Sequence, residues 1–297
     1  MFVTKLDVSH ASDLQKLLSD HNFEFNSVPY SLVSGKKKGI SCTLYESGKL
    51  VVQGKEAQQF IEFYLEPQIL KEFNFTYKEL TVDQTPHIGI DEAGKGDVFG
   101  PLCIAGVYAE GAGSLKLLDM GVKDSKHLSD QKVLLLSQKI RENYPHHVII
   151  LFPRKYNELY PKFPNLNHML GWGHASVAEQ LIQKTGCNNV TIDQFASEYV
   201  VENALKRKKM QVQLTQRHRA EEDIVVAAAS ILARAAFLEG LKQLGDRLGY
   251  PLPKGAASIT IDFGKKAVEQ YGPAILTDIA KTHFKTVKQI LGLPVEQ

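Results

Sequence analysis

Residues 87–101 read HIGIDEAGKGDVFGP, and this segment contains the most informative pattern in the chain. Ile88 and Ile90 flank a glycine, and two adjacent carboxylates, Asp91 and Glu92, follow before a glycine-rich loop. Apolar side chains that recur with period two are typical of a β-strand. The segment therefore predicts a strand that delivers two acidic side chains into a loop.

The two adjacent acids are candidate metal ligands. Buried or crowded carboxylates cost free energy unless a cation or hydrogen bonds compensate. Hard divalent cations prefer oxygen ligands, so Asp91 and Glu92 suit such an ion. Taken alone, the pair fits two ordinary surface acids at a strand end equally well.

Two further acids stand at places where they could join the pair. Asp193 closes the apolar run 190–192, at the end of a predicted strand, and Asp223 opens the apolar stretch 224–237. The ordinary alternatives are a turn residue for Asp193 and a dipole-stabilised acid at a helix start for Asp223. Because strand-end carboxylates of an α/β sheet converge at one edge, we expect all four acids to share a site.

The ligand set limits the metal and the reaction. Four carboxylates without clustered His or Cys favour Mg²⁺ or Mn²⁺ over zinc. A pair of such ions activates water and stabilises the leaving oxygen in phosphodiester hydrolysis. Residues 89–95 resemble a phosphate-binding loop, but Gly96 occupies the place of its Ser or Thr, and the two acids would add negative charge. A nucleoside triphosphatase is therefore excluded.

Composition indicates a folded protein without a membrane span. The chain has 297 residues, with 43% hydrophobic and 23% charged residues, which suits one or two ordered domains. No signal-peptide pattern opens the sequence, so we expect a cytoplasmic location. The three cysteines are widely separated, which excludes a disulfide framework and a CxxC metal site.

The order of patterns predicts two domains. Residues 1–66 suit a small α+β unit, with a helix at 11–19, a hairpin over 40–54 around Ser47 and Gly48, and a helix over 55–65. Residues 67–84 read as a linker. From 85 to 297, five predicted strands (87–91, 102–109, 147–152, 190–193 and 210–215) alternate with helices that start near 129 and 167, span 197–208 and run over 221–244. This alternation predicts an α/β domain with a mixed five-stranded sheet.

Charge is concentrated in the second part of the chain. Residues 1–85 carry a net charge of −2 and the remainder +4. Candidate phosphate contacts are the run KRKK at 206–209, RHR at 217–219 and the lysines of 281–288, with GKKKG at 35–39 in the first domain. For Lys208 and Lys209, a favourable position at a helix C-terminus explains the charge better.

Seven segments in the expected order resemble the ribonuclease HIII family of type 2 ribonucleases H. They are DEAGKGD with FGP, KDSK, LNHMLGWGHA, IDQF, HRAEEDIVVAAASILAR and THFKT, and they cover roughly residues 85–290. Lys95, Asp97, WGHA and HFKT favour this family over ribonuclease HII. The resemblance implies a ribonuclease H-like fold. Residues 1–66 fit the family's TATA-binding-protein-like extension, which in the family helps to hold an RNA–DNA hybrid.

The resemblance also assigns roles to residues. Asp91, Glu92, Asp193 and Asp223 match the catalytic, metal-binding acids. Gly94, Lys95 and Gly96 match the loop that approaches ribose 2′-hydroxyls, the groups that distinguish RNA from DNA. Lys123, Ser125 and Lys126 match substrate-contacting positions. His168, His174 and His283 keep the interpretation of surface polar groups.

The implied activity is endonucleolytic hydrolysis of the RNA strand of RNA–DNA hybrids by a two-metal mechanism that leaves 5′-phosphate and 3′-hydroxyl ends. Mg²⁺ or Mn²⁺ is the expected cofactor and the hybrid the expected partner. No membrane and no obligate protein partner is expected, which predicts a monomer. The alternatives are ribonuclease HII-like cleavage at single embedded ribonucleotides and a hybrid-binding module without turnover. Four acids beside phosphates argue against the binding module, because a pure binder gains from removing negative charge.

Overall fold

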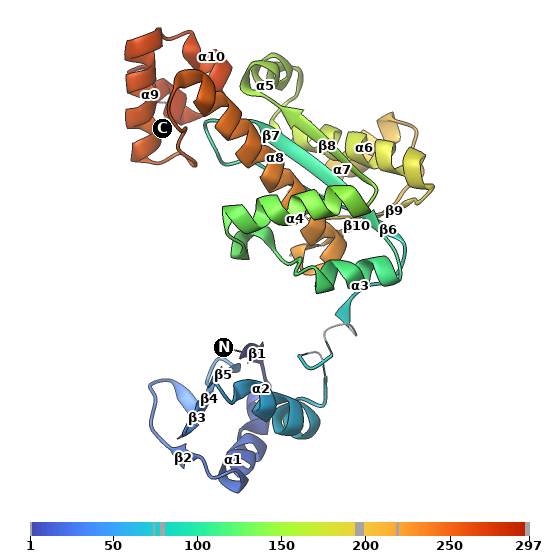
Figure 1. Ribbon diagram of the computed structural model, residues 1–297, viewed down its shortest axis with the longest axis vertical. Helices are drawn as coiled ribbons and strands as arrows, with labels where there is room; N and C mark the ends of the chain where they lie inside the picture. Colours follow the sequence, from blue (N-terminus) through green and yellow to red (C-terminus); the bar gives the residue numbers. More distant parts are fainter. Residues whose placement is uncertain (1, 74, 78–80, 194–198, 218–219, 295–297) are drawn as a thin grey trace. The chain divides into compact units, whose positions relative to one another are not determined.

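The computed structural model describes all residues except 1, 74, 78–80, 194–198, 218–219 and 295–297 (Figure 1). The chain divides into two compact units, Met1–Thr81 and Val82–Gln297. Each unit has its own hydrophobic core. The two units are therefore described separately.

The N-terminal unit is an antiparallel five-stranded sheet with helices against one face. The strand order is β1-β5-β4-β3-β2. The elements in chain order are β1 (Phe2–Lys5), η1 (Val8–His10), α1 (Ala11–Asp20), β2 (Glu24–Phe25), β3 (Ser31–Lys37), β4 (Ile40–Tyr45), β5 (Lys49–Gly54), α2 (Ala57–Phe60) and η2 (Ile61–Leu70). The β4–β5 hairpin turns at Gly48, which has φ 76°, as the sequence predicts. The first two lysines of GKKKG lie in β3, because Lys36 and Lys37 pair with Ser41 and Ile40.

The segment predicted as a linker begins inside this unit. Helical structure continues past Pro67 to Leu70, and the Lys71 N–H donates to the Glu66 carbonyl at 2.7 Å. The buried Glu66 carboxylate then accepts from the Phe75 and Thr76 N–H groups. Phe75 also packs edge-on against Phe2, with ring centroids 5.0 Å apart. These contacts extend the N-terminal unit beyond the expected boundary at residue 66.

The second unit is built on a mixed five-stranded sheet of order β10-β9-β6-β7-β8. Its strands are β6 (His87–Ala93), β7 (Leu102–Ala109), β8 (His146–Leu151), β9 (Asn189–Asp193) and β10 (Gln213–Arg217). The first three pair antiparallel, and β9 and β10 run parallel to β6. The predicted mixed α/β sheet is confirmed, with strand ends shifted by one to three residues.

Helices cover both faces of this sheet (Figure 1). On one face, Ile88, Ile90 and Ile104 pack with α6 (Leu166–Thr185) and α7 (Tyr199–Arg207). On the other, Ala105 and Val107 pack with α3 (Ala112–Asp119), α4 (Asp130–Asn143) and α8 (Ile224–Leu248). Further helical elements are η4 (Ser125–His127), α5 (Pro153–Leu159), η5 (Tyr160–Lys162), η6 (Ala220–Glu222), α9 (Ser258–Tyr271), α10 (Ile275–Ile279) and α11 (Lys285–Ile290).

Helix ends follow local sequence signals. The Ser129 hydroxyl accepts from the Lys132 N–H and caps α4, whose start near residue 129 was predicted. Gly186 closes α6 with φ 74°. Both caps fix the lengths of the helices that cover the sheet.

Helix α8 lies along β6, and its direction matters for the site. A Cβ on Gly89 would come within 2.4 Å of the Val226 nitrogen, so only glycine permits this approach. Farther along, a Cβ on Gly94 would meet the Phe237 ring at 2.9 Å. The start of α8 therefore lies near the start of β6, and later turns of α8 lie near its end. The helix is long and apolar enough to span a membrane, but 83% of its most apolar window is buried, as in a core helix.

Candidate active site

Three of the four predicted acids meet at one edge of the sheet. Strands β6 and β9 run parallel, and Ile90 pairs with Ile192, so the next residues, Asp91 near the end of β6 and Asp193 at the end of β9, lie side by side. Asp91, Glu92 and Asp193 all line a cavity of about 440 Å³. The expectation that strand-end carboxylates converge is confirmed for these three residues.

The carboxylates are crowded, and their pKa values reflect it. Burial, followed by the charge of Glu92, raises the pKa of Asp91 from 3.8 to about 7. Burial opposes ionisation of Glu92 as well, but the hydrogen bond and charge of His174, together with Lys95, hold its pKa below 4.5. A cation would relieve the repulsion that raises the Asp91 pKa. The all-oxygen donor set and the crowding therefore fit a hard divalent metal ion.

The glycine loop forms one wall of the same cavity, with Gly94, Lys95 and Gly96 lining it. Gly94 has φ 84°, and a Cβ there would lie 2.2 Å from the Pro101 carbonyl oxygen, so this position requires glycine. Nothing lies within 4 Å of the position where a Cβ of Gly96 would be. The backbone at Gly96 is therefore open to a ligand that approaches closely.

The KDSK segment contributes two of its three predicted residues. Ser125 and Lys126 line the cavity, whereas Lys123 is exposed and lies outside the lining. Ser125 is buried, and its hydroxyl lies 2.9 Å from the Ser230 hydroxyl of α8. Arg234, one turn farther along α8, donates to the Ser125 carbonyl and to Asp130. Ser125 is therefore held inside the protein, and Lys126 is the exposed residue of this segment that lines the cavity.

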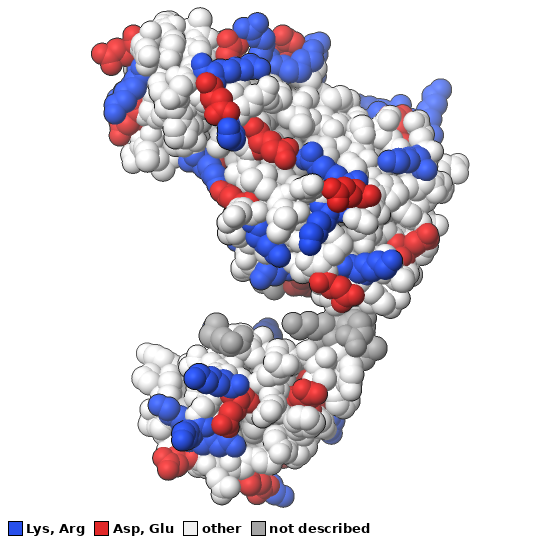
Figure 2. All heavy atoms as spheres, viewed as in Figure 1, with Lys and Arg blue, Asp and Glu red and all other residues white. Residues whose placement is uncertain are grey.

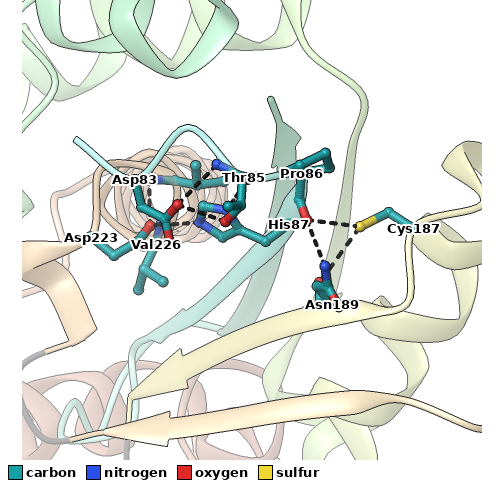
Figure 3. Close-up of polar contacts among 9 residues, drawn as sticks. Asp83, Thr85, Pro86, His87, Cys187, Asn189, Asp223 and Val226 are labelled. Atoms are coloured by element: carbon teal, nitrogen blue, oxygen red, sulfur yellow. Dashed lines mark hydrogen bonds and ion pairs between the residues drawn. The ribbon is translucent and has the colours of Figure 1, made fainter. Parts of the chain in front are cut away.

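The fourth predicted acid, Asp223, is not in this cavity, and this part of the prediction is corrected. Asp223 is buried and caps α8, and its Oδ1 accepts from the Val225 and Val226 N–H groups at 2.8 and 3.1 Å. The same oxygen lies 3.0 Å from His87 Nε2, at the start of β6 (Figure 3). His87 precedes Asp91 by four residues, roughly 13 Å of strand at about 3.3 Å per residue. Asp223 therefore lies beside the start of β6, whereas Asp91 and Glu92 lie near its end.

The group around Asp223 is an ion pair. Ligand atoms of Asp83, His87 and Asp223 lie within 4.8 Å of one another, a spacing that could hold a metal (Figure 3). However, His87 Nδ1 lies 2.7 Å from the Thr85 carbonyl, and both neighbours of the ring accept hydrogen bonds. Burial lowers the pKa of His87, but Asp223 outweighs it and raises the pKa above 6.5. A protonated His87 thus donates to both the Thr85 carbonyl and Asp223 and balances the charge of Asp223 without a metal.

The second unit matches a known enzyme family. The sequence profile of ribonuclease HII matches residues 88–287. A ribonuclease HIII from Protochlamydia amoebophila is 55% identical over 98% of this chain and 97% of that protein, and one from Chlamydia abortus is 47% identical over 97% of each. The chain belongs to the ribonuclease HIII family. It is therefore an endoribonuclease, as the sequence motifs predicted.

A solved structure and a second sequence profile extend the comparison to the N-terminal unit. The crystal structure of Bst-RNase HIII in complex with Mn²⁺ aligns with a TM-score of 0.69 and 27% identity over 98% of each chain. Residues 1–76 match a profile described as a domain of unknown function. The solved protein thus resembles this ribonuclease HIII family member over both units.

His174, which the sequence interpretation placed on the surface, is buried beside Glu92. It is 1% exposed, and its Nε2 donates to Glu92 Oε2 at 3.0 Å. The other oxygen of Glu92 lies 3.6 Å from the Lys95 ammonium. His174 therefore orients the Glu92 carboxylate from the side opposite the glycine loop. The other two histidines lie outside the cavity lining: His168 contacts the helix cap Asn165, and His283 stacks on Tyr160.

We expect His174→Ala to weaken Mn²⁺ binding by about 10- to 100-fold, the usual cost of removing a group that orients a metal ligand. His174→Gln, which retains an N–H donor, should recover part of this loss. Mn²⁺ titration followed by calorimetry measures both variants. His168→Ala is the matched control, and equal losses in His168→Ala and His174→Ala would refute the assignment.

Lys281 is a second residue that sequence reasoning left among the phosphate contacts. It is 1% exposed and donates to the carbonyl groups of Asp97 and Gly100, both at 2.8 Å. Its backbone N–H donates to the Val98 carbonyl, also at 2.8 Å. Lys281 is therefore a positioning residue that fixes the chain just after the glycine loop, and its ammonium is inaccessible to phosphate.

Lys281→Met should destabilise the catalytic unit by about 2–4 kcal/mol, since two buried carbonyls lose a charged donor. The KM for a nucleic-acid substrate should rise more than kcat falls, because the loop that contacts substrate loses its anchor. Urea unfolding and steady-state kinetics test both effects. Lys265→Met removes an exposed lysine of α9 that is not among the candidate phosphate contacts, and it should change neither quantity.

Proposed function

We propose that this enzyme hydrolyses the RNA strand of RNA–DNA hybrids with Mg²⁺ or Mn²⁺, leaving 5′-phosphate and 3′-hydroxyl ends. The observation that carries the proposal is the meeting of Asp91, Glu92 and Asp193 in one cavity beside an open glycine loop. The ribonuclease HIII names of its relatives support the substrate class.

Asp91, Glu92 and Asp193 are the residues that would hold the metal ions. Divalent ions in such a site neutralise charge on the phosphodiester and lower the pKa of water. The protein's part is to fix the ligands: the Glu92 N–H donates to Asp91 Oδ1 at 2.8 Å, and the Ala220 N–H donates to Asp193 Oδ1 at 3.2 Å. Oriented carboxylates bind a metal without reorganising when it arrives.

A further carboxylate from η6 would take the place assigned to Asp223. Ala220, the first residue of η6, contacts Asp193 through its N–H group, and Glu221 and Glu222 follow directly. We propose that one of these two glutamates completes the acidic site.

Substrate discrimination would come from the glycine loop. A backbone that is open at Gly96 can approach ribose 2′-hydroxyls, which DNA lacks. Lysine and arginine side chains line the same cavity at positions 95, 126, 234 and 254 and would face the phosphates. On the face drawn in Figure 2, basic and acidic side chains are interspersed over both units, so local contacts rather than a uniform positive field would position the substrate.

The N-terminal unit is proposed to hold the hybrid through the open face of its sheet. Alternate residues of β4 are buried under the helices, and the others, such as Ser41 and Thr43, remain half-buried. Ser41 pairs with Lys36 on one side and Gln53 on the other, which forms a polar row across three strands. Hydrogen-bonding groups in this row suit a nucleic-acid backbone even though the unit carries no net positive charge.

The test uses a labelled RNA strand annealed to DNA, annealed to RNA, or left single, with Mg²⁺, Mn²⁺ or EDTA. We expect metal-dependent cleavage of the hybrid alone, with downstream fragments that ligate without prior phosphorylation. A DNA duplex with one embedded ribonucleotide tests the ribonuclease HII-like alternative. Salt-dependent binding of the hybrid by folded protein, with no cleavage under any metal, would support the binding module and overturn the proposal.

A further inference from the structure

The basic run at 206–209 separates in the structure into residues with different surroundings. The Lys206 ammonium lies 3.5 Å from Glu202, and the Lys208 ammonium lies 2.5 Å from Glu179. Arg207 and Lys208 both line a cavity of about 360 Å³ between the first turns of α6, the segment before it, and α7, whereas Lys206 does not. Lys162 lines the same cavity from the end of η5. Three cations thus border one concave site, which we term the α6–α7 cavity: the exposed Lys162 and Arg207, and the half-buried Lys208, which is paired with Glu179.

Aromatic side chains form one wall of the α6–α7 cavity. Phe163 and Trp172 pack together with ring centroids 5.8 Å apart, and both remain half-buried. Polar groups of His168 and Asn203 and the apolar Val200 and Ala204 complete most of the lining. Its described lining includes no Asp or Glu. The volume falls within the range of roughly 300–1,000 Å³ that small-ligand sites occupy.

The α6–α7 cavity is separate from the active site. No lining residue is common to the two cavities. Trp172 and His174 both belong to α6, but two residues correspond to about 200° of rotation around a helix. Their side chains therefore point in nearly opposite directions, His174 toward Glu92 and Trp172 toward the α6–α7 cavity.

We propose that the α6–α7 cavity binds a nucleotide unit, with the base against Trp172 and the phosphate at Arg207 and Lys162. Bases of every kind stack on aromatic rings, and arginine matches phosphate with a planar pair of donors. The unit can come from a free mononucleotide or from an unpaired stretch of a nucleic-acid strand. The proposal adds a nucleic-acid contact outside the catalytic cavity and does not require turnover.

Trp172 makes the test direct, because it is the single tryptophan of the chain. Its fluorescence is titrated in EDTA with AMP, adenosine, inorganic phosphate and single-stranded DNA, with N-acetyltryptophanamide as the optical control. We expect saturable quenching by AMP, by single-stranded DNA or by both, which identifies the source. Adenosine should bind about tenfold more weakly than AMP, and phosphate alone should leave the indole emission unchanged.

Variants distinguish binding at the α6–α7 cavity from non-specific attraction of nucleotides to surface lysines and arginines. The double variant Lys162→Ala with Arg207→Ala should weaken binding of the quenching probe by about tenfold or more. Lys206→Ala, the neighbouring cation that contacts Glu202 and does not line the cavity, should bind as the wild type does. Binding should also weaken as salt rises, because phosphate contacts release counterions.

Three results would overturn the proposal. The first is that neither AMP nor single-stranded DNA quenches the fluorescence saturably. The second is that Lys206→Ala loses as much affinity for the probe as the double variant Lys162→Ala with Arg207→Ala. The third is that phosphate quenches as strongly as AMP, which would show an anion site only. Because the titration contains no metal, its outcome is independent of hybrid cleavage. If the protein proved unable to cleave hybrids, the proposed nucleotide site would be unaffected. If no nucleotide bound to the α6–α7 cavity, the proposed hybrid cleavage would likewise be unaffected.

Discussion

Asp193→Asn should reduce hybrid cleavage by about a thousandfold or more while hybrid binding changes little. Losing one neutral preorganised donor typically costs about 10²–10³-fold in rate, and a carboxylate that holds a metal should cost at least as much. Asp193 belongs to this class because it ends β9 beside Asp91 and lines the same cavity. Asparagine has nearly the same shape, so packing at the end of β9 should persist.

Two measurements separate catalysis from binding in this variant. Single-turnover cleavage with excess enzyme gives the rate, and fluorescence anisotropy of a labelled hybrid in EDTA gives the affinity. Calorimetric Mn²⁺ titration should show weaker binding by the variant. Asp246→Asn, which removes an exposed acid paired with Lys242 on α8, is the control. Hybrid binding that falls in proportion to cleavage would contradict the role assigned to Asp193.

Strand periodicity in the sequence was enough to predict the positions of Asp91, Glu92 and Asp193. Alternation fixes where β6 and β9 end, and parallel neighbours place their ends at one edge, so Asp91, Glu92 and Asp193 could be located without a structure. The glycine loop follows from the same segment. These residues are close in sequence to the strand ends that position them, which is why periodicity was sufficient.

The sequence pattern could not place Asp223 relative to the cavity, because a helix start carries no information about the direction of the helix relative to the sheet. Helix α8 approaches β6 at Gly89, so its cap lies beside His87 and not beside Asp91. His174 and Lys281 were misjudged for a related reason. Each contacts a residue more than eighty positions away, and only the packed structure brings those groups together.

The N-terminal boundary illustrates a local limit of the sequence. Pro67 suggested a helix end, since proline in a helix interior removes a hydrogen bond. The helix nevertheless continues to Leu70, and the Glu66 carboxylate binds the N–H groups of Phe75 and Thr76. A side chain that folds the following chain back onto its own unit has no periodic signature.

Asp223→Ala should lower the free energy of unfolding of the catalytic unit by about 3–5 kcal/mol, the usual cost of breaking a buried ion pair. The change removes the partner of His87 and the cap of α8, where two N–H groups lose their acceptor. Asp223→Asn should cost less, because asparagine is also a good helix cap. Urea unfolding followed by Trp172 fluorescence reports on this unit.

The stability difference between wild type and Asp223→Ala should depend on pH in a defined direction. The pKa of His87 is raised above 6.5, so its contribution is full below that pH and is lost as pH rises through the folded value. Burial opposes ionisation of Asp223, but His87 and the α8 N–H groups hold its pKa below 3.8, so its contribution is lost only in stronger acid. The difference should therefore be largest between pH 3.8 and 6.5 and should shrink in alkali.

Activity measured beside stability decides whether Asp223 is structural or catalytic. Under conditions where the protein remains folded, Asp223→Asn should retain most hybrid cleavage. Glu221→Gln and Glu222→Gln should leave unfolding almost unchanged, and one of them should reduce cleavage by about 10²-fold or more, a loss comparable to that of a preorganised catalytic group. If folded Asp223→Asn instead loses cleavage as Asp193→Asn does, and both glutamate variants stay active, then Asp223 must reach the metal site. Asp223 directly follows η6, whose Ala220 N–H donates to Asp193, so such a contact would require a shift of this turn.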